Sequence, residues 1–219
     1  KSDLPQVMFD LAGWPLVRHV VEIARALRPE RLVVVVGHGK KLVEEAVGGK
    51  TDGVPEVEVV VQRQQRGTGH AVRCAEKALS GFEGSVLVLL GDVPLVPVKT
   101  LKALLGRHRR RKAAATVLSG RAPDPRGYGR VLRDAKGRVL AVREDKDATA
   151  AEKAVDEVNT GILAFDAGKL WPALGKLKAN NAQGEFYLTD VPGLLLSQGE
   201  RIEAQEVEDF DHVRGVNSH

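Results

Sequence analysis

The chain has 219 residues, of which 43% are hydrophobic, 28% charged and 4% aromatic, and it carries a formal net charge of +4. These values are typical of one large or two small soluble globular α/β domains, and they exclude a disordered, collagenous, coiled-coil or disulfide-stapled chain. A transmembrane helix is excluded too, because the strongest apolar run, residues 86–90, falls far short of the ~20 residues that span a bilayer.

Helical and extended patterns alternate through the first half of the chain. We expect helices over residues 15–27, 40–47 and 69–79 and after residue 97, and strands over residues 31–37, 57–62 and 85–91. This alternation predicts a parallel sheet. Because the strands are apolar throughout, we expect helices on both faces.

The second half has shorter extended runs, separated by Asp-Pro, Gly-Tyr-Gly and Lys-Gly turns. The runs are residues 113–118, 129–133, 138–144 and 161–165. They predict a mixed-sheet lobe built onto the first half. No linker marks the division, so we expect one domain over residues 1–219, with lobes at approximately 1–120 and 121–219.

The single cysteine and the basic residues limit the classes of partner. Cys74 is the single cysteine, so it has no partner for an intramolecular disulfide, and no base lies beside it in the sequence. We therefore expect Cys74 to have a packing role and the protein to be in the reducing cytoplasm. The basic block at residues 107–112 is typical of a solvated helix end. Interleaved aromatic residues, an RNA-binding signature and zinc-finger spacing are all missing, so we expect no nucleic-acid partner.

A carboxylate after the strand at residues 85–91 is a candidate metal ligand. Gly91 and Asp92 end this apolar strand, and open α/β sheets bind ligands beyond the carboxyl ends of their strands. The oxygen atoms of Asp92 suit Mg²⁺, which takes one or two protein groups and leaves its other positions to phosphate and water. A cap for the following helix explains the same pair equally well.

A glycine-rich polar turn at residues 62–70 connects another apolar strand to a helix. Gly67 and Gly69 let the backbone approach a ligand closely, and the helix N-terminus favours an anion or a polar base edge. Gln62 offers both a donor and an acceptor, as a nucleobase edge requires. An ordinary strand-to-helix turn remains the alternative, and the segment is neither a Walker A loop nor a dinucleotide fingerprint.

Polar turns in the second half could line a site for a sugar. They lie at residues 124–130, 144–147, 157–161 and 180–190. Glycine backbone, carboxylates and amides are the groups that bind sugar hydroxyls. Ordinary turns are the alternative, with Thr189 or Asp190 capping the helix expected at residues 191–197.

A series of short motifs stands in one order over essentially the whole chain. The motifs are Ser2-Asp3-Leu4-Pro5, Leu11-Ala12-Gly13, Gly37-His38-Gly39, Gln62 with Gly67-Thr68-Gly69-His70-Ala71, Gly91-Asp92-Val93-Pro94-Leu95, Gly127-Tyr128-Gly129-Arg130, Glu144 with Lys146-Asp147-Ala148-Thr149, Glu157-Val158-Asn159-Thr160-Gly161, Asn181-Ala182-Gln183-Gly184-Glu185 and Gly215-Val216-Asn217. Together they closely resemble the uridyltransferase domain of the bacterial bifunctional N-acetylglucosamine-1-phosphate uridyltransferase / glucosamine-1-phosphate acetyltransferase family.

This resemblance implies a Rossmann-like nucleotidyltransferase fold with a mixed central sheet. It implies an enzyme that joins UTP and N-acetylglucosamine 1-phosphate to give UDP-N-acetylglucosamine and pyrophosphate, in cytoplasmic synthesis of peptidoglycan precursors for the cell wall. A related sugar-1-phosphate nucleotidyltransferase is a further candidate, against which the motif at residues 181–185 argues.

The resemblance also implies the residues of the site. The uracil contacts match Gln62, Gly67 and Thr68. Further substrate contacts match Gly91, Gly129, Glu144 and Asn159, with residues 181–189 close by. The Mg²⁺ ligands, which are also the expected catalytic residues and contact substrate, match Asp92 and Asn217.

The chain departs from the family pattern in ways that bear on catalysis. Gln6 stands where the family has a lysine, and a neutral amide cannot neutralise charge on a phosphate. Leu90 replaces a tyrosine of the family. We expect the chain to be truncated at its N-terminal end, so that the family's glycine-rich triphosphate loop, which would lie immediately before Lys1, is missing. A catalytically impaired nucleotide-sugar-binding domain is therefore the alternative function. We expect a monomer without the family's C-terminal β-helix domain, and a homotrimer for a full-length member.

Overall fold

The computed structural model describes residues 5–48 and 52–216. The helices are α1 (Leu16–Ala26), α2 (Lys40–Val47), α3 (Thr68–Cys74), α4 (Val98–Arg110), α5 (Ala150–Lys153), α6 (Ala167–Gly175) and α7 (Asp190–Ser197), with 3-10 helices η1 (Gln6–Met8), η2 (Asp145–Asp147) and η3 (Phe210–Val213). The strands are β1 (Asp10–Leu11), β2 (Trp14–Pro15), β3 (Leu32–Val36), β4 (Val57–Val61), β5 (Ser85–Val88), β6 (Ala115–Arg121), β7 (Arg130–Arg133), β8 (Val139–Arg143), β9 (Glu157–Asp166) and β10 (Ile202–Glu206).

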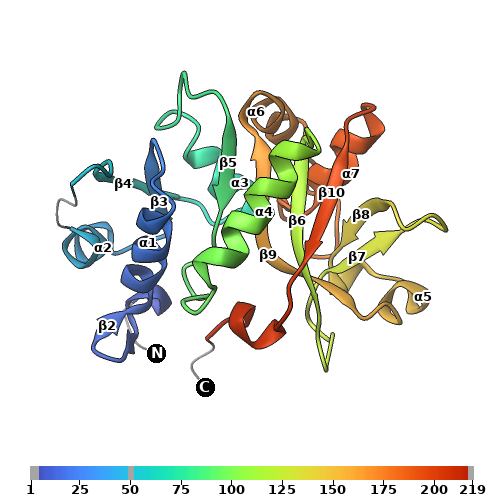
Figure 1. Ribbon diagram of the computed structural model, residues 1–219, viewed down its shortest axis with the longest axis horizontal. Helices are drawn as coiled ribbons and strands as arrows, with labels where there is room; N and C mark the ends of the chain where they lie inside the picture. Colours follow the sequence, from blue (N-terminus) through green and yellow to red (C-terminus); the bar gives the residue numbers. More distant parts are fainter. Residues whose placement is uncertain (1–4, 49–51, 217–219) are drawn as a thin grey trace.

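A mixed sheet of six strands forms the centre of the molecule (Figure 1). Its order is β10-β6-β9-β7-β8, and β5 also pairs with β9. The pair β10–β6 is parallel, whereas β9 runs antiparallel to β5, β6 and β7. The mixed sheet expected from the sequence is confirmed. It takes strands from both expected lobes, and the boundary near residue 120 stays a prediction.

Among the described residues, the parallel pairing expected in the first half extends over β3 and β4 alone. These strands form a separate parallel pair, and β5, expected in the same sheet, pairs antiparallel with β9 instead. A cavity of about 450 Å³ lies between β3 and β5, lined largely by apolar side chains that include Val21, Val34 and Leu87. The extension of this parallel sheet to residues 85–91 is therefore wrong, because the long strand β9 supplies the hydrogen-bond partner of β5.

Helices cover both faces of the central sheet, as its apolar strands predict. Ile162 and Ala164 of β9 pack on the side of α4, whereas Leu163 and Phe165 pack on the side of α6 and α7. This alternation follows from the two-residue period of a strand, and all four side chains are buried. Figure 1 shows α4 crossing one face of the sheet. None of the helices in the described ranges is long and apolar enough to span a bilayer.

Several element boundaries differ from the prediction. The helix expected at residues 69–79 ends at Cys74, and β9 begins at Glu157, before the expected start at residue 161. The sequence pattern missed α6, which contains Pro172, a residue that usually ends helices. It also missed β10, a polar segment that extends because it pairs with the buried strand β6.

Candidate active site

The ends of β3 and β5 lie at one edge of the molecule, beside η1. A Cβ atom on Gly91, which follows β5, would lie 2.8 Å from Cγ1 of Val7, and one on Gly39, which follows β3, would lie 2.7 Å from Cγ of Pro5. The carboxyl ends of these strands therefore face the same short helix. This is the edge at which open α/β sheets bind their ligands.

Gln62 follows β4 at this edge, with 8% of its surface exposed. Its backbone N–H donates to the carbonyl oxygen of Val36 at 2.8 Å. Its side-chain nitrogen Nε2 donates to the carbonyl oxygen of Gly67 at 3.2 Å and lies 2.9 Å from Nδ1 of His70. The structure therefore places the predicted base-reading amide in a fixed position against the turn that follows it.

The turn at residues 66–69 is joined to the segment at residues 185–188. Phe186 accepts a hydrogen bond from the N–H of Gly69 at 2.7 Å and donates one to the carbonyl oxygen of Arg66 at 2.9 Å. The hydroxyl oxygen of Thr68 accepts from the N–H of Leu188 at 3.0 Å. Two polar segments that are far apart in the sequence thus form one wall of the site.

Gly129, Glu144 and Asn159 come together because β7, β8 and β9 are neighbours in the central sheet. The N–H of Asn159 donates to the carbonyl oxygen of Gly129 at 2.8 Å, and a Cβ atom on Gly129 would lie 3.7 Å from Oε1 of Glu144. The same Oε1 atom accepts from the hydroxyl of Thr189 at 2.7 Å. Thr189 is the N-cap residue of α7, but its hydroxyl bonds to Glu144 and its side chain makes no cap hydrogen bond, so the interpretation of Thr189 as a side-chain cap is wrong.

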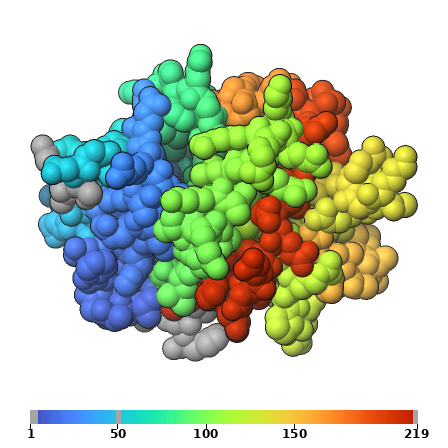
Figure 2. Space-filling model, viewed as in Figure 1, coloured from blue at the N-terminus to red at the C-terminus, as the bar shows by residue number. Residues whose placement is uncertain are grey.

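Asp92 lies between η1, β9 and the C-terminal segment. The side chain of Leu90 packs against Gly161 of β9, which has a φ of +85° and no Cβ to block this contact. The backbone oxygen of Asp92 accepts from the N–H of Val216 at 2.8 Å. Figure 2 shows the red C-terminal segment against the green segment that follows β5. Asn217, the other predicted metal ligand, lies outside the described residues.

The carboxylate of Asp92 makes no polar contact with the described part of the chain. Within residues 5–48 and 52–216, no hydrogen bond or ion pair engages this carboxylate, although Oδ2 lies 3.3 Å from where a Cβ on Gly215 would stand. The N-cap of α4 is Pro97, so the interpretation of Asp92 as a helix cap is wrong. In the described part of the chain, no group of three or more His, Cys, Asp or Glu could hold a metal ion by itself.

Residues 5–159 match the family model of a MobA-like NTP transferase domain. The chain belongs to this family. It is 46% identical over 99% of its length to the bifunctional protein GlmU of Corynebacterium glutamicum, and 43% identical over 99% to that of Streptococcus gordonii. It spans about half of each relative, 45% and 46% of their lengths. These findings confirm the resemblance that the motifs indicate.

The fold of this NTP transferase domain is similar to a solved structure of UDP-glucose pyrophosphorylase complexed with UDP-glucose. The TM-score is 0.76 at 19% identity, over 93% of this chain and 82% of the other. The Rossmann-like nucleotidyltransferase fold expected from the sequence is confirmed. At this level of identity, the likeness supports the fold and not the substrate.

Acidic groups gather beside Glu144 in the NTP transferase domain. Burial raises the pKa of the Asp190 carboxyl, the charges of Glu144 and Asp147 raise it further, and the charge of Arg143 opposes them. Burial likewise raises the pKa of the Tyr187 hydroxyl, which donates to Oδ2 of Asp147 at 3.1 Å. These contacts attach the segment at residues 181–189 to η2.

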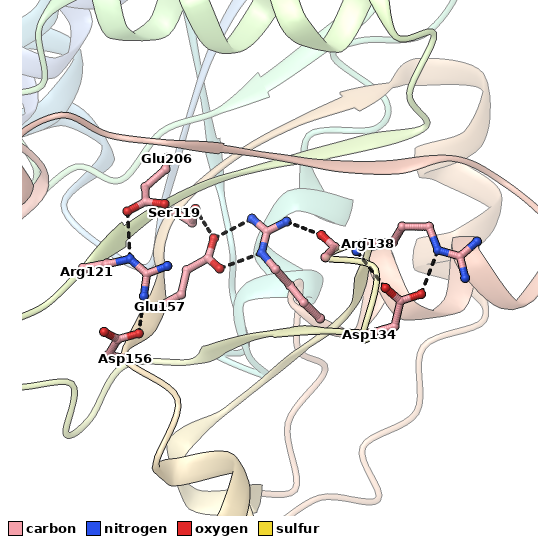
Figure 3. A network of polar contacts seen from close by, with 9 residues as sticks. Ser119, Arg121, Asp134, Arg138, Asp156, Glu157 and Glu206 are labelled. Atoms are coloured by element: carbon pink, nitrogen blue, oxygen red, sulfur yellow. Dashed lines mark hydrogen bonds and ion pairs between the residues drawn. The ribbon is translucent and has the colours of Figure 1, made fainter.

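The buried Glu157 anchors the beginning of β9 outside the site (Figure 3). Its Oε1 atom accepts from Ser119 Oγ at 2.7 Å, and Arg133 donates to both carboxylate oxygens at 2.7 Å. Burial disfavours the charge, but the hydrogen bonds from Arg133 and Ser119 outweigh it and hold the pKa of this carboxyl below its usual value. Glu157 therefore fixes the strand that carries Asn159.

Sequence reasoning gave no role to His70, Tyr187 or Glu157. His70 and Glu157 belong to motifs that carry the family resemblance, and Tyr187 lies two residues after one of them. Their contacts with Gln62, Ser119 and Asp147 join positions that are 8, 38 and 40 residues apart. Proximity in the sequence gives no sign of such contacts.

Proposed function

We propose that this domain is a uridyltransferase that joins UTP and N-acetylglucosamine 1-phosphate, releases pyrophosphate and supplies UDP-N-acetylglucosamine for peptidoglycan synthesis in the cytoplasm. The observation that carries the proposal is the wall formed by residues 66–69 and 185–188, which links a base-reading turn to the sugar side of the site. Similarity to the GlmU proteins over 99% of the chain supports it.

In this reaction a phosphate oxygen of the sugar phosphate attacks the α-phosphorus of UTP. A new P–O bond forms, the bond to the bridging oxygen of the β-phosphate breaks, and pyrophosphate leaves with the electron pair. Positioning of the two substrates and neutralisation of charge supply most of the catalysis in phosphoryl transfer of this kind, so no protein nucleophile is needed.

We propose the following roles for the site residues, and their places in the structure support them. Gln62, Gly67 and Thr68 would bind the uracil at the turn after β4. Backbone groups at Gly91 would approach the phosphates. The sugar hydroxyls would be bound by Gly129, Glu144 and Asn159, which meet across three neighbouring strands.

Asp92 fits a divalent cation, which we propose to be Mg²⁺. The carboxylate is a hard oxygen donor at the edge of the sheet, and the described residues do not neutralise it. Asn217 would be the second protein ligand. A bound Mg²⁺ supplies positive charge at the phosphates.

Gln6 is the reason for the alternative function, a domain that binds nucleotide sugars without catalysing the transfer. Its Nε2 atom donates to the carbonyl oxygen of Val216 at 3.3 Å, beside Asp92, where the family has a cationic lysine. Similarity to GlmU over nearly the whole chain does not favour this alternative.

Two assays on the same protein test the proposal. Pyrophosphate release is measured with UTP, N-acetylglucosamine 1-phosphate and Mg²⁺, and binding of UDP-N-acetylglucosamine is measured by calorimetry. Release that requires both substrates supports the uridyltransferase. Binding without release supports the alternative domain. The absence of both binding and release would contradict both functions.

A further inference from the structure

We infer that His70 contributes to the choice of pyrimidine at this site, because its Nδ1, together with the carbonyl oxygen of Gly67, holds the Gln62 amide in one orientation. The inference rests on the proposed function, in which Gln62 reads the base. His70 does not itself face the base in this scheme. It is a positioning residue, whose effect reaches the substrate through Gln62.

The neighbours of Gln62 settle which end of its amide is the nitrogen. The carbonyl oxygen of Gly67 can only accept a hydrogen bond, so the amide atom 3.2 Å away must be the NH₂ group. The same nitrogen lies 2.9 Å from Nδ1 of His70. Nδ1 must therefore accept, and the neutral ring carries its proton on Nε2.

The frame around this amide is rigid. Gly67 lies close against the backbone of Phe186, because a Cβ atom there would lie 2.6 Å from the Phe186 oxygen. The carbonyl oxygen of Gly67 also accepts from the N–H of Ala71 at 3.0 Å, which ties it to the first turn of α3. His70 stands on that same turn. Both acceptors for the Gln62 NH₂ group are thus held by one element.

This arrangement leaves Gln62 with an acceptor to offer. Its Oε1 atom makes no hydrogen bond within the residues that the structure describes, and the same holds for the N–H groups of Gly67 and Thr68. An acceptor beside donors complements uracil, which presents its N3–H next to the O4 carbonyl. Cytosine presents the reverse pattern, an acceptor at N3 next to the N4 amino group.

Removal of the Nδ1 acceptor should therefore reduce discrimination between the bases. Without it, one N–H of a nearly buried amide loses its partner, and the amide can turn to offer NH₂ to cytosine N3. A single hydrogen bond of this kind contributes about 0.5–1.5 kcal/mol, so we expect the preference for UTP over CTP to fall about 2- to 12-fold.

The test compares dissociation constants for UTP and CTP, with Mg²⁺, in four proteins. The wild type should prefer UTP, His70→Leu should lose much of this preference, and His70→Asn, whose Oδ1 can replace the acceptor, should recover it. Arg73→Leu, an exposed change on the same helix, should behave as the wild type. Nitrogen-15 NMR of the wild type should show His70 protonated at Nε2 and not at Nδ1.

The outcomes separate the inference from the function on which it rests. A wild type that binds neither nucleotide contradicts the proposed function, and the role of His70 fails with it. A wild type that prefers UTP, with the full preference kept in His70→Leu, overturns the inference alone. Equal weakening of UTP and CTP in His70→Leu would show a merely structural role and would also overturn it, as would an Nδ1–H tautomer.

Discussion

Replacement of Gly67 by alanine tests the contact between the two segments that form one wall of the site, residues 66–69 and 185–188. Gly67 has a φ of +103° and a ψ of 173°, a backbone conformation almost restricted to glycine. A Cβ atom would lie 2.6 Å from the oxygen and 2.9 Å from the nitrogen of Phe186. Because both are backbone atoms, rotation of a side chain cannot relieve the contact, and the peptide at Phe186 must move.

The expected loss of stability has two parts. Backbone strain costs about 1–3 kcal/mol. Movement of Phe186 also disrupts its hydrogen bonds with Arg66 and Gly69, and the loss of each bond lowers the free energy of unfolding by about 0.5–1.5 kcal/mol. We therefore expect Gly67→Ala to lower the free energy of unfolding by about 2–6 kcal/mol. At about 2–4 °C per kcal/mol for a chain of this size, Tm should fall by at least about 4 °C.

Gly137→Ala is the matched control for this substitution. Gly137 has a φ of +75°, and a Cβ atom there meets nothing within 4 Å, so strain alone costs about 1–2 kcal/mol. Urea unfolding followed by circular dichroism measures both variants. If Gly67→Ala loses no more stability than Gly137→Ala, the contact with Phe186 does not constrain the site and the reasoning is refuted.

Three further predictions concern the metal ligand, the buried carboxylate and the oligomeric state. Asp92→Ala should abolish Mg²⁺-dependent pyrophosphate release without lowering Tm. Release that persists in this variant would show that Asp92 is not a metal ligand. Glu157→Gln should be less stable than the wild type at pH 7. Since the folded-state pKa of Glu157 is lowered, its stabilisation is present above the unfolded pKa and is lost as the pH falls through the folded value, so urea unfolding should show the difference shrinking below about pH 4. Light scattering should give the mass of one chain, because the exposed large apolar side chains in the described ranges, Trp14, Leu42, Leu95 and Leu140, lie on separate segments. A trimer would contradict this prediction.

Elements with a local pattern of apolar residues are predictable from the sequence. The apolar stripe of α1 and the continuous apolar runs of β3 and β4 have the period and length of their elements, so their positions were predictable within one or two residues. The motifs also placed the candidate residues in strand ends and turns. Their order along the chain was enough to indicate the family, because each motif can be recognised without knowledge of what it contacts.

The tertiary structure alone decided which of these pieces meet. Pairing of β5 with β9 and of β10 with β6 joins strands about 80 residues apart, and no local pattern specifies such partners. The contacts of Gly67 with Phe186 and of Glu144 with Thr189 arise in the same way. Hydrogen bonds and packing across the sheet select these partners, since they form only when distant segments are brought into register, and the shape of the site depends on them.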